Sequence, residues 1–206
     1  VNDVFASQNR AVTARDYEAI VYRMPAKFGR VKRAKIIRDR DSFKRNLNLY
    51  VAGEDKDNNL LQCNQALKNN LRIWVNKYRM LNDTIDILDA KIMNLEISFT
   101  LVAYMNVNKY DVLDSCMRTM TAYYKNKYYD IGEPFKITDV YKLLNNIPAV
   151  LDVKDVTVVP KTGGLYSDFE ILYGDLISND NRYLIPPEDV IFEVKFPSTD
   201  IHGEVL

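Results

Sequence analysis

The 206-residue sequence contains few of the residues on which many enzyme and metal sites are built. It has seven Gly, two Cys and a single His, which argues against glycine-rich phosphate loops and against a structural zinc site. Gly163 and Gly164 precede neither a helix nor a Lys-Ser/Thr pair, so they indicate a turn. We therefore expect no catalytic residue, no cofactor and no metal.

Long hydrophobic runs and a cysteine framework are also missing. No run of 18 apolar residues occurs, which excludes a transmembrane helix and gives no reason to expect a membrane partner. The hydrophobic content of 47% nevertheless supports a buried core rather than disorder. Cys63 and Cys116 each fall on the apolar face of a predicted helix, so we expect reduced, buried thiols. A disulfide stays open, because a sequence does not give the distance between two Cα atoms.

One acidic segment matches a calcium-binding loop only at its start. Asp55, Asp57 and Asn59 occupy the first three ligand positions of such a loop. Leu60 stands where the loop needs Gly, and Ala66 stands where it needs Glu. The sequence therefore predicts a solvated loop without a bound ion.

Catalytic carboxylates and a catalytic histidine have equally weak support. Asp86 and Asp89 bracket Ile87 and Leu88 at a spacing that does not distinguish an acid–base pair from a turn. The only histidine, His202, lies in a Pro-Ser-Thr-Asp segment near the last residue, where a loose tail is expected. These patterns favour a protein without catalytic activity.

Helical periodicity and capping residues predict four helices. Thr13 is the expected N-cap of the first, with Asp16 in a near capping-box position, and Asn108 is the expected N-cap of the third. The helices are predicted at residues 13–22, 60–80, 109–129 and 138–145, the last capped by Thr138.

Alternating apolar residues predict strands between these helices. The most regular covers residues 90–104, which is long for a strand and is therefore expected to bend. The others are expected at 31–39, 43–51 and 190–196, with a hairpin of 153–159 and 166–173. The order ββαβααβββ predicts an α+β fold with mixed sheets and interleaved helices. We expect one domain or two small subdomains, residues 1–85 and 86–206.

A net charge of zero conceals two strongly charged ends. Residues 10–45 contain twelve Lys and Arg against four acidic residues, whereas residues 130–206 contain six against fourteen. Such ends favour head-to-tail association of copies, which closes into rings or extends into filaments. Neutralisation within one monomer and two solvated faces are alternatives. A nucleic-acid-binding domain that uses the 10–45 segment is another, supported by the Tyr- and Lys-rich stretch 123–129.

Two segments resemble the baseplate J-like family of contractile-tailed phages. The first is AVTARDYEAIV at residues 11–21, followed by Pro25, Val31 and the basic RAK at 33–35. The family has a similar helix, proline and basic strand. The second is IGEPFKITDVYKLLNNIPAV at residues 131–150, similar to the family segment that precedes its terminal hairpin. The two segments occur in the family order and bracket most of the chain.

The resemblance implies a structural protein without catalytic residues, located in the tail baseplate of a virion and assembled in the host cytoplasm. Members of the family pair as homodimers, contact other baseplate wedge proteins and join neighbouring wedges into a ring around the tail tube. By the same resemblance, subunit contacts are expected near the basic strand and along the third predicted helix. The candidate interface residues are Arg30, Arg33, Lys35, Arg38, Arg40, Tyr123, Tyr124 and Tyr128.

Overall fold

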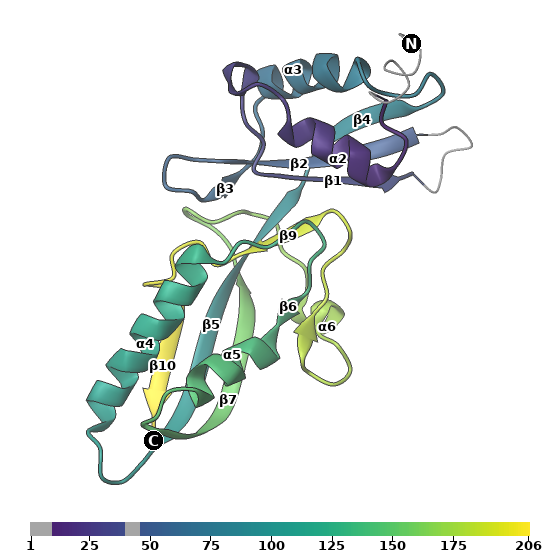
Figure 1. Ribbon diagram of the computed structural model, residues 1–206. Coiled ribbons are helices and arrows are strands. Elements are labelled where there is room, and N and C mark those ends of the chain that lie inside the picture. The colour runs from purple at the N-terminus through teal and green to yellow at the C-terminus, as the bar shows by residue number, and fades with distance from the viewer. Residues whose placement is uncertain (1–9, 40–45) are drawn as a thin grey trace, which may run out of the picture. The chain divides into compact units, whose positions relative to one another are not determined.

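The computed structural model describes residues 10–39 and 46–206, which form two compact units (Figure 1). The N-terminal unit ends at Ala90 and the C-terminal unit starts at Lys91. Each unit combines a mixed sheet with helices packed on one face of that sheet. The α+β class predicted from the sequence is therefore confirmed.

Two helices cover one face of a four-stranded sheet in the N-terminal unit. Its elements are α2 (Ala14–Tyr22), the 3-10 helix η1 (Ala26–Phe28), β1 (Arg33–Arg38), β2 (Asn46–Glu54), β3 (Leu60–Leu61), α3 (Gln65–Asn76) and β4 (Thr84–Asp89). The central strand β2 pairs antiparallel with β1 and β3 and parallel with β4. Tyr17 and Leu71 from the helices pack with Leu49 and Ile87 from the strands in one buried core.

A full capping box starts α2. Thr13 Oγ1 accepts the N–H of Asp16 at 3.2 Å, and Asp16 Oδ2 accepts the N–H of Thr13 at 2.8 Å. These hydrogen bonds from backbone N–H groups lower the pKa of Asp16. The charged carboxylate also suits the positive end of the helix dipole. The predicted near capping box is thus complete.

The helix predicted over residues 60–80 is shorter in the structure. Asn64 Oδ1 accepts the N–H of Leu67 at 2.8 Å, so α3 begins only at Gln65. Cys63 therefore precedes the helix instead of lying on its apolar face. Cys63 and Cys116 are both free and buried, and burial raises the pKa of each thiol to about 11.

The C-terminal unit is built around its first strand. Its elements are β5 (Lys91–Ala103), α4 (Lys109–Asn126), β6 (Phe135–Lys136), α5 (Ile137–Asn145), β7 (Val150–Lys161), α6 (Tyr173–Leu176), β8 (Tyr183–Leu184), β9 (Val190–Glu193) and β10 (Ile201–Val205). β7 pairs antiparallel with one edge of β5. β9 pairs in parallel with the start of β5, and β10 pairs in parallel with its second half. Two separate strands therefore pair with successive parts of β5. α4 packs on β10 and α5 packs on β7 (Figure 1).

The apolar residues that alternate along β5 form the centre of the core of this unit. Met93, Leu95, Ile97, Phe99 and Leu101 are all buried, as their spacing predicts. The pairing with β7 is irregular at two positions near the end of β5, which fits the expectation that so long a strand is not regular throughout. No helix within residues 10–39 and 46–206 combines the length and apolar character of a membrane span.

Two local predictions are wrong, and for a third segment the structure differs from an alternative that the sequence left open. The segment 166–173 is not a strand: β7 pairs with β5 in place of a local hairpin partner. Thr138 lies inside α5 and is not its cap, because the helix already starts at Ile137 after Lys136. Asp86 and Asp89 do not form a turn but lie on β4, whose parallel partner is β2.

Candidate interaction surfaces

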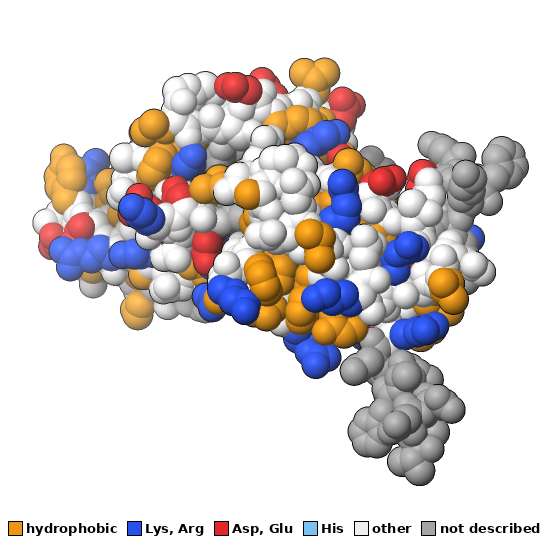
Figure 2. All heavy atoms as spheres, turned by 90° about the horizontal axis from the view of Figure 1, so that it is seen from above, with side chains coloured by type: hydrophobic (Ala, Val, Ile, Leu, Met, Phe, Trp, Pro, Cys, Tyr) orange, Lys and Arg blue, Asp and Glu red, His pale blue; other side chains and the backbone are white. Residues whose placement is uncertain are grey.

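The exposed side of α2 presents a basic stripe. Arg15, Ala19 and Arg23 follow one another at four-residue intervals and are all exposed, so they share one side of the helix. The carboxylates of this helix are engaged elsewhere: Asp16 caps its own helix, and Glu18 Oε1 accepts the N–H of Ile36 at 3.1 Å. On the face seen from above, Lys and Arg side chains lie beside hydrophobic ones (Figure 2).

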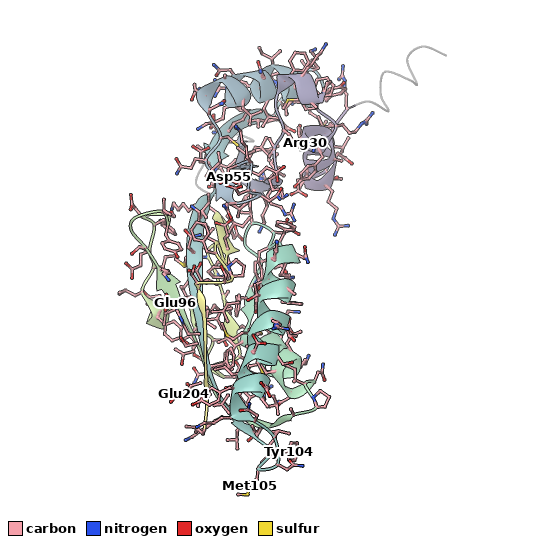
Figure 3. The ribbon with its side chains drawn as sticks, turned by 90° about the vertical axis from the view of Figure 1, so that its left-hand side faces the viewer. Arg30, Asp55, Glu96, Tyr104, Met105 and Glu204 are labelled. Carbon is pink, nitrogen blue, oxygen red and sulfur yellow. The ribbon has the colours of Figure 1, made fainter. Side chains whose placement is uncertain are left out.

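The basic residues predicted on one strand are divided between the two faces of the sheet. Arg33 and Lys35 alternate with the core residue Ile36, so they point away from the helices. Arg38 has the parity of Ile36 and lies exposed at the end of β1. Arg30 is exposed before the strand (Figure 3). The fifth residue of this predicted set, Arg40, lies outside the described residues.

Side chains of α2 occupy the free edge of β1. The Tyr22 hydroxyl accepts the N–H of Ala34 at 2.9 Å, and Glu18 accepts the N–H of Ile36, two residues further along β1. These N–H groups point away from β2 and would otherwise be open to another strand. The N-terminal sheet is therefore protected on this side, and α2 is fixed to it by directed hydrogen bonds.

The three predicted interface tyrosines differ in exposure. Tyr124 is buried and stacks on Phe135 with ring centroids 6.0 Å apart. Burial raises the pKa of the Tyr124 hydroxyl, as expected for a tyrosine in the core. Tyr123 is half-buried and packs edge-on against Tyr124, whereas Tyr128 is 39% exposed. Tyr128 is thus the tyrosine of this set that is most accessible to a partner.

The face of the C-terminal sheet that is turned away from α4 and α5 carries polar rows. Glu204, Thr100 and Asp155 lie side by side on β10, β5 and β7, because Thr100 pairs with both neighbours. The next row along the strands is His202, Ser98 and Thr157. A shallow hollow of about 310 Å³ lies over these two rows. We call the surface formed by these two rows the acidic sheet face. Figure 3 shows Glu204 on the side of the sheet away from α4.

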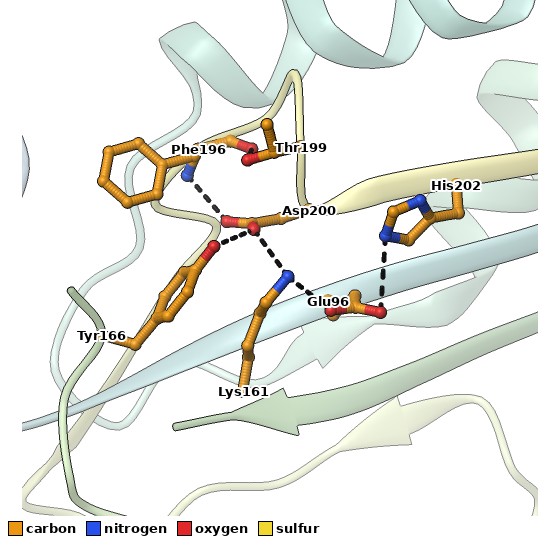
Figure 4. A network of polar contacts seen from close by, with 7 residues as sticks. All are labelled: Glu96, Lys161, Tyr166, Phe196, Thr199, Asp200 and His202. Carbon is orange, nitrogen blue, oxygen red and sulfur yellow. Dashed lines mark hydrogen bonds and ion pairs between the residues drawn. The ribbon is translucent and has the colours of Figure 1, made fainter. Parts of the chain in front are cut away.

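A buried carboxylate organises the neighbouring part of the same face (Figure 4). Asp200 has no exposed surface; its Oδ1 accepts from the Tyr166 hydroxyl at 2.5 Å and from Lys161 Nζ at 3.1 Å. Its Oδ2 accepts the N–H of Phe196 at 2.8 Å. Lys161 also binds Glu96 at 2.6 Å, and this hydrogen bond is the main cause of the raised pKa of Lys161. The network fixes the chain between β9 and β10.

His202 belongs to this network and not to a loose tail. It lies on β10, paired with Ser98, and its Nε2 is 3.5 Å from Glu96 Oε1. The prediction of a loose tail is wrong, because a parallel strand pairing holds the segment. Neither the strand pairing nor the contacts of Asp200 with Tyr166 and Lys161 have a local signal, since these two side chains lie 34 and 39 residues from Asp200.

The acidic candidates of the sequence show no metal-binding geometry. Within the described ranges, no three His, Cys, Asp or Glu side chains gather as ligands. Asp55 Oδ1 accepts the N–H groups of Asp57 and Asn59, at 2.8 and 2.9 Å, so the carboxylate stabilises its own loop. This arrangement agrees with the predicted solvated loop.

One apolar surface has no counterpart in the sequence predictions. Tyr104, Met105, Val107 and Tyr110 are exposed where β5 connects to α4 (Figure 3). They follow the alternating strand directly, so the sequence alone does not separate them from the core positions before them.

The fold is similar to that of a chain in the cryo-EM structure of the anti-feeding prophage baseplate, determined with six-fold symmetrisation. The two share 12% sequence identity with a TM-score of 0.54, and the match covers 93% of this chain and 39% of the other. This chain thus spans well under half the length of that baseplate chain. Neither the known family models nor the curated proteins include a match to the sequence. The likeness in structure establishes a shared fold.

Proposed function

We propose that this protein is a structural subunit of a phage-type tail baseplate. The observation that carries the proposal is the fold shared with a prophage baseplate chain over 93% of the sequence. The two segments at residues 11–21 and 131–150, which resemble the baseplate J-like family, support it independently. In the structure the first of these forms most of α2, and the second contains β6 and α5.

Within the baseplate, the proposed role is that of a wedge protein that associates with itself and with other wedge proteins. Such subunits would join neighbouring wedges into a ring around the tail tube, and the Asn- and Tyr-rich sequence resembles the C-terminal part of the T-even wedge protein, gene product six. The proposed location is the virion tail, after assembly in the host cytoplasm. Residues 1–90 have 17 Lys and Arg against 11 acidic residues, and residues 91–206 have 11 against 17. That asymmetry supports contacts between unlike surfaces.

The role is proposed to be structural and not enzymatic. The polar clusters of the described residues have evident structural tasks: Asp16 caps a helix, Asp55 closes a loop and Asp200 fixes the crossover between two strands. The predicted contact residues on or next to β1 and α4 are candidate interface positions, with Arg30, Arg38 and Tyr128 the most accessible of those described.

Mass spectrometry of purified tail particles tests the baseplate assignment. Particles from the organism that encodes this chain should contain it in a constant ratio to the other tail proteins. A chain found only in the soluble pool, while tails are complete, would contradict the assignment.

Nucleic-acid binding is the second candidate, because the α2 stripe is basic and exposed. Phosphate contacts would make binding strong at low salt and weak at high salt. Fluorescence anisotropy with a labelled DNA duplex at about 50 mM salt measures this directly. Absence of binding there removes the candidate.

A further inference from the structure

No helix of the described residues lies over the acidic sheet face, while the opposite face of the same sheet is covered by α4 and α5. We infer that this face is a docking surface for the basic α2 stripe of a second copy of this chain. The inference rests on the proposed baseplate function and specifies which surfaces of two neighbouring copies meet. It makes the contact heterologous, since the acidic face of one copy receives the helix of the next.

The spacing of the charges on the two surfaces is similar. Glu204 and Asp155 lie two strands apart across Thr100, which is about 10 Å at the usual strand separation. Arg15 lies in the first turn of α2 and Arg23 is the C-cap residue of the same helix, so the two are eight residues, or about 12 Å, apart along the helix axis. Long arginine side chains span the small difference. The helix can therefore lie across the strands with one arginine near each carboxylate.

The residues between the charges allow a close approach. Ala19 lies between the two arginines, so the helix presents a small side chain at the centre of the stripe. On the other surface, the shallow hollow covers Thr100 and Ser98 between the strands that carry the carboxylates. A small residue above a hollow lets the backbone of the helix come near the sheet without a steric clash.

The electrostatic partners of both surfaces are available. Neither Arg15 nor Arg23 has an acidic group within 4.0 Å among the described residues, and both are exposed. Lys161, a cation on the same side of the C-terminal sheet, is engaged by Glu96 and Asp200. Among the described residues, Asp155 Oδ2 accepts only the Thr157 hydroxyl, at 3.0 Å, so this carboxylate is accessible to a partner. The charges of each surface therefore favour the other surface.

The size of the contact predicts its strength. Three strands across and about six residues along give roughly 14 Å by 20 Å, well below the roughly 800 Å² per partner of a stable two-protein interface. A single contact is therefore expected to be weak, in the micromolar range or above. In a closed ring each copy is held by two such contacts, and the effective concentration makes them strong together.

Charge reversal on each side, followed by mixing, tests the inference. The two variants of the full chain are Arg15→Glu with Arg23→Glu, and Asp155→Arg with Glu204→Arg. Sedimentation velocity from about 10 to 500 μM, at roughly 50 mM salt, should show concentration-dependent association for the wild type. Each variant alone should associate at least about tenfold more weakly. An equimolar mixture of the two should regain association, because the reversed charges are again complementary.

A matched control separates this contact from a general effect of net charge. Arg72→Glu with Lys77→Glu changes the charge equally at exposed positions on or next to α3 of the same unit, and association should stay as in the wild type. A mixture that stays monomeric, or a wild type that does so up to 500 μM, overturns the inference. A change in hydrodynamic radius without a change in mass also overturns it, since the contact would lie within one chain. If the chain is present in tail particles in these cases, the baseplate assignment stands without this interface.

Discussion

The Tyr17 hydroxyl donates a 2.6 Å hydrogen bond to Asp83 Oδ2, and both side chains are buried. The same hydroxyl oxygen accepts the N–H of Met80 at 3.2 Å. Tyr17 of α2 thereby fixes the segment between α3 and β4. Asp83, in that segment, lies 66 residues further along the chain than Tyr17. The helix that carries the proposed docking stripe is tied to its unit from its buried side.

Tyr17→Phe removes this hydroxyl and leaves the Asp83 carboxylate buried without its partner. We expect a loss of about 1–3 kcal/mol in the free energy of unfolding, measured by urea denaturation at pH 7. The benzene ring remains, so the core packing of α2 is retained. A loss below about 0.5 kcal/mol would show that water satisfies Asp83 in the variant.

The same residue predicts a dependence of stability on pH. Burial, followed by the hydrogen bond to Asp83, raises the pKa of Tyr17 to about 12 from 10.0. Above pH 10 the unfolded state loses this proton first, so it binds fewer protons than the folded state and the free energy of unfolding falls until about pH 12. Urea denaturation at pH 8.5, 10 and 11 should show a smaller fall in Tyr17→Phe than in the wild type. Equal slopes in the two proteins would contradict the raised pKa.

Trp74 joins α3 to α2 by packing and by one hydrogen bond. Its Nε1–H donates to the carbonyl oxygen of Ile20 at 2.8 Å, and its ring meets Tyr78 edge-on at 5.2 Å. It is half-buried against the core, so Trp74→Ala is expected to cost about 3 kcal/mol, at the lower end of the range for core aromatic residues. Thermal denaturation with Trp74→Phe as a partial-loss control measures this. A cost under about 1 kcal/mol would place the contribution of Trp74 in an interface instead of the core.

Elements with strong local signals were predictable from the sequence. Thr13 and Asn108 cap the helices that they were expected to cap, and the alternation of β5 gives its buried residues directly. These features depend on neighbours within a few residues. A capping hydroxyl or a period of two therefore has the same meaning in the sequence and in the fold.

Elements held by distant partners were not predictable. β4 carries Asp86 on its exposed face, and it is a strand because it pairs in parallel with β2, almost forty residues earlier. His202 is ordered because β10 pairs with the middle of β5, about a hundred residues earlier. Parallel pairing has no turn that marks it locally. The acidic sheet face combines residues of β10, β5 and β7, so its rows exist only in the folded chain.

Gly203 is required by the close approach of β10 to the core. A Cβ at this position would lie 2.4 Å from Phe99 Cζ and 2.8 Å from Leu113 Cδ1. Gly203→Ala should therefore cost about 1–3 kcal/mol through overpacking. Gly174→Ala is the matched control, since a Cβ there meets nothing within 4 Å, and it should be neutral or slightly stabilising. Equal stabilities of the two variants would mean that Phe99 moves aside without cost.

Asp200→Asn tests whether the buried network holds β10 against β5. The amide keeps the shape of the carboxylate but loses the charge that Lys161 binds, and its NH₂ group cannot accept from Tyr166 or Phe196. Breaking a buried charged pair costs about 3–5 kcal/mol, and we expect the lower end because Lys161 keeps its bond to Glu96. Hydrogen exchange should show the loss first in the amides of Ile201–Val205. Asp180→Asn is the control: it changes an exposed carboxylate 3.9 Å from Arg182 and should leave the protection of β10 unchanged. If protection in β10 is unchanged while global stability falls, Asp200 stabilises the unit as a whole and does not specifically hold this strand.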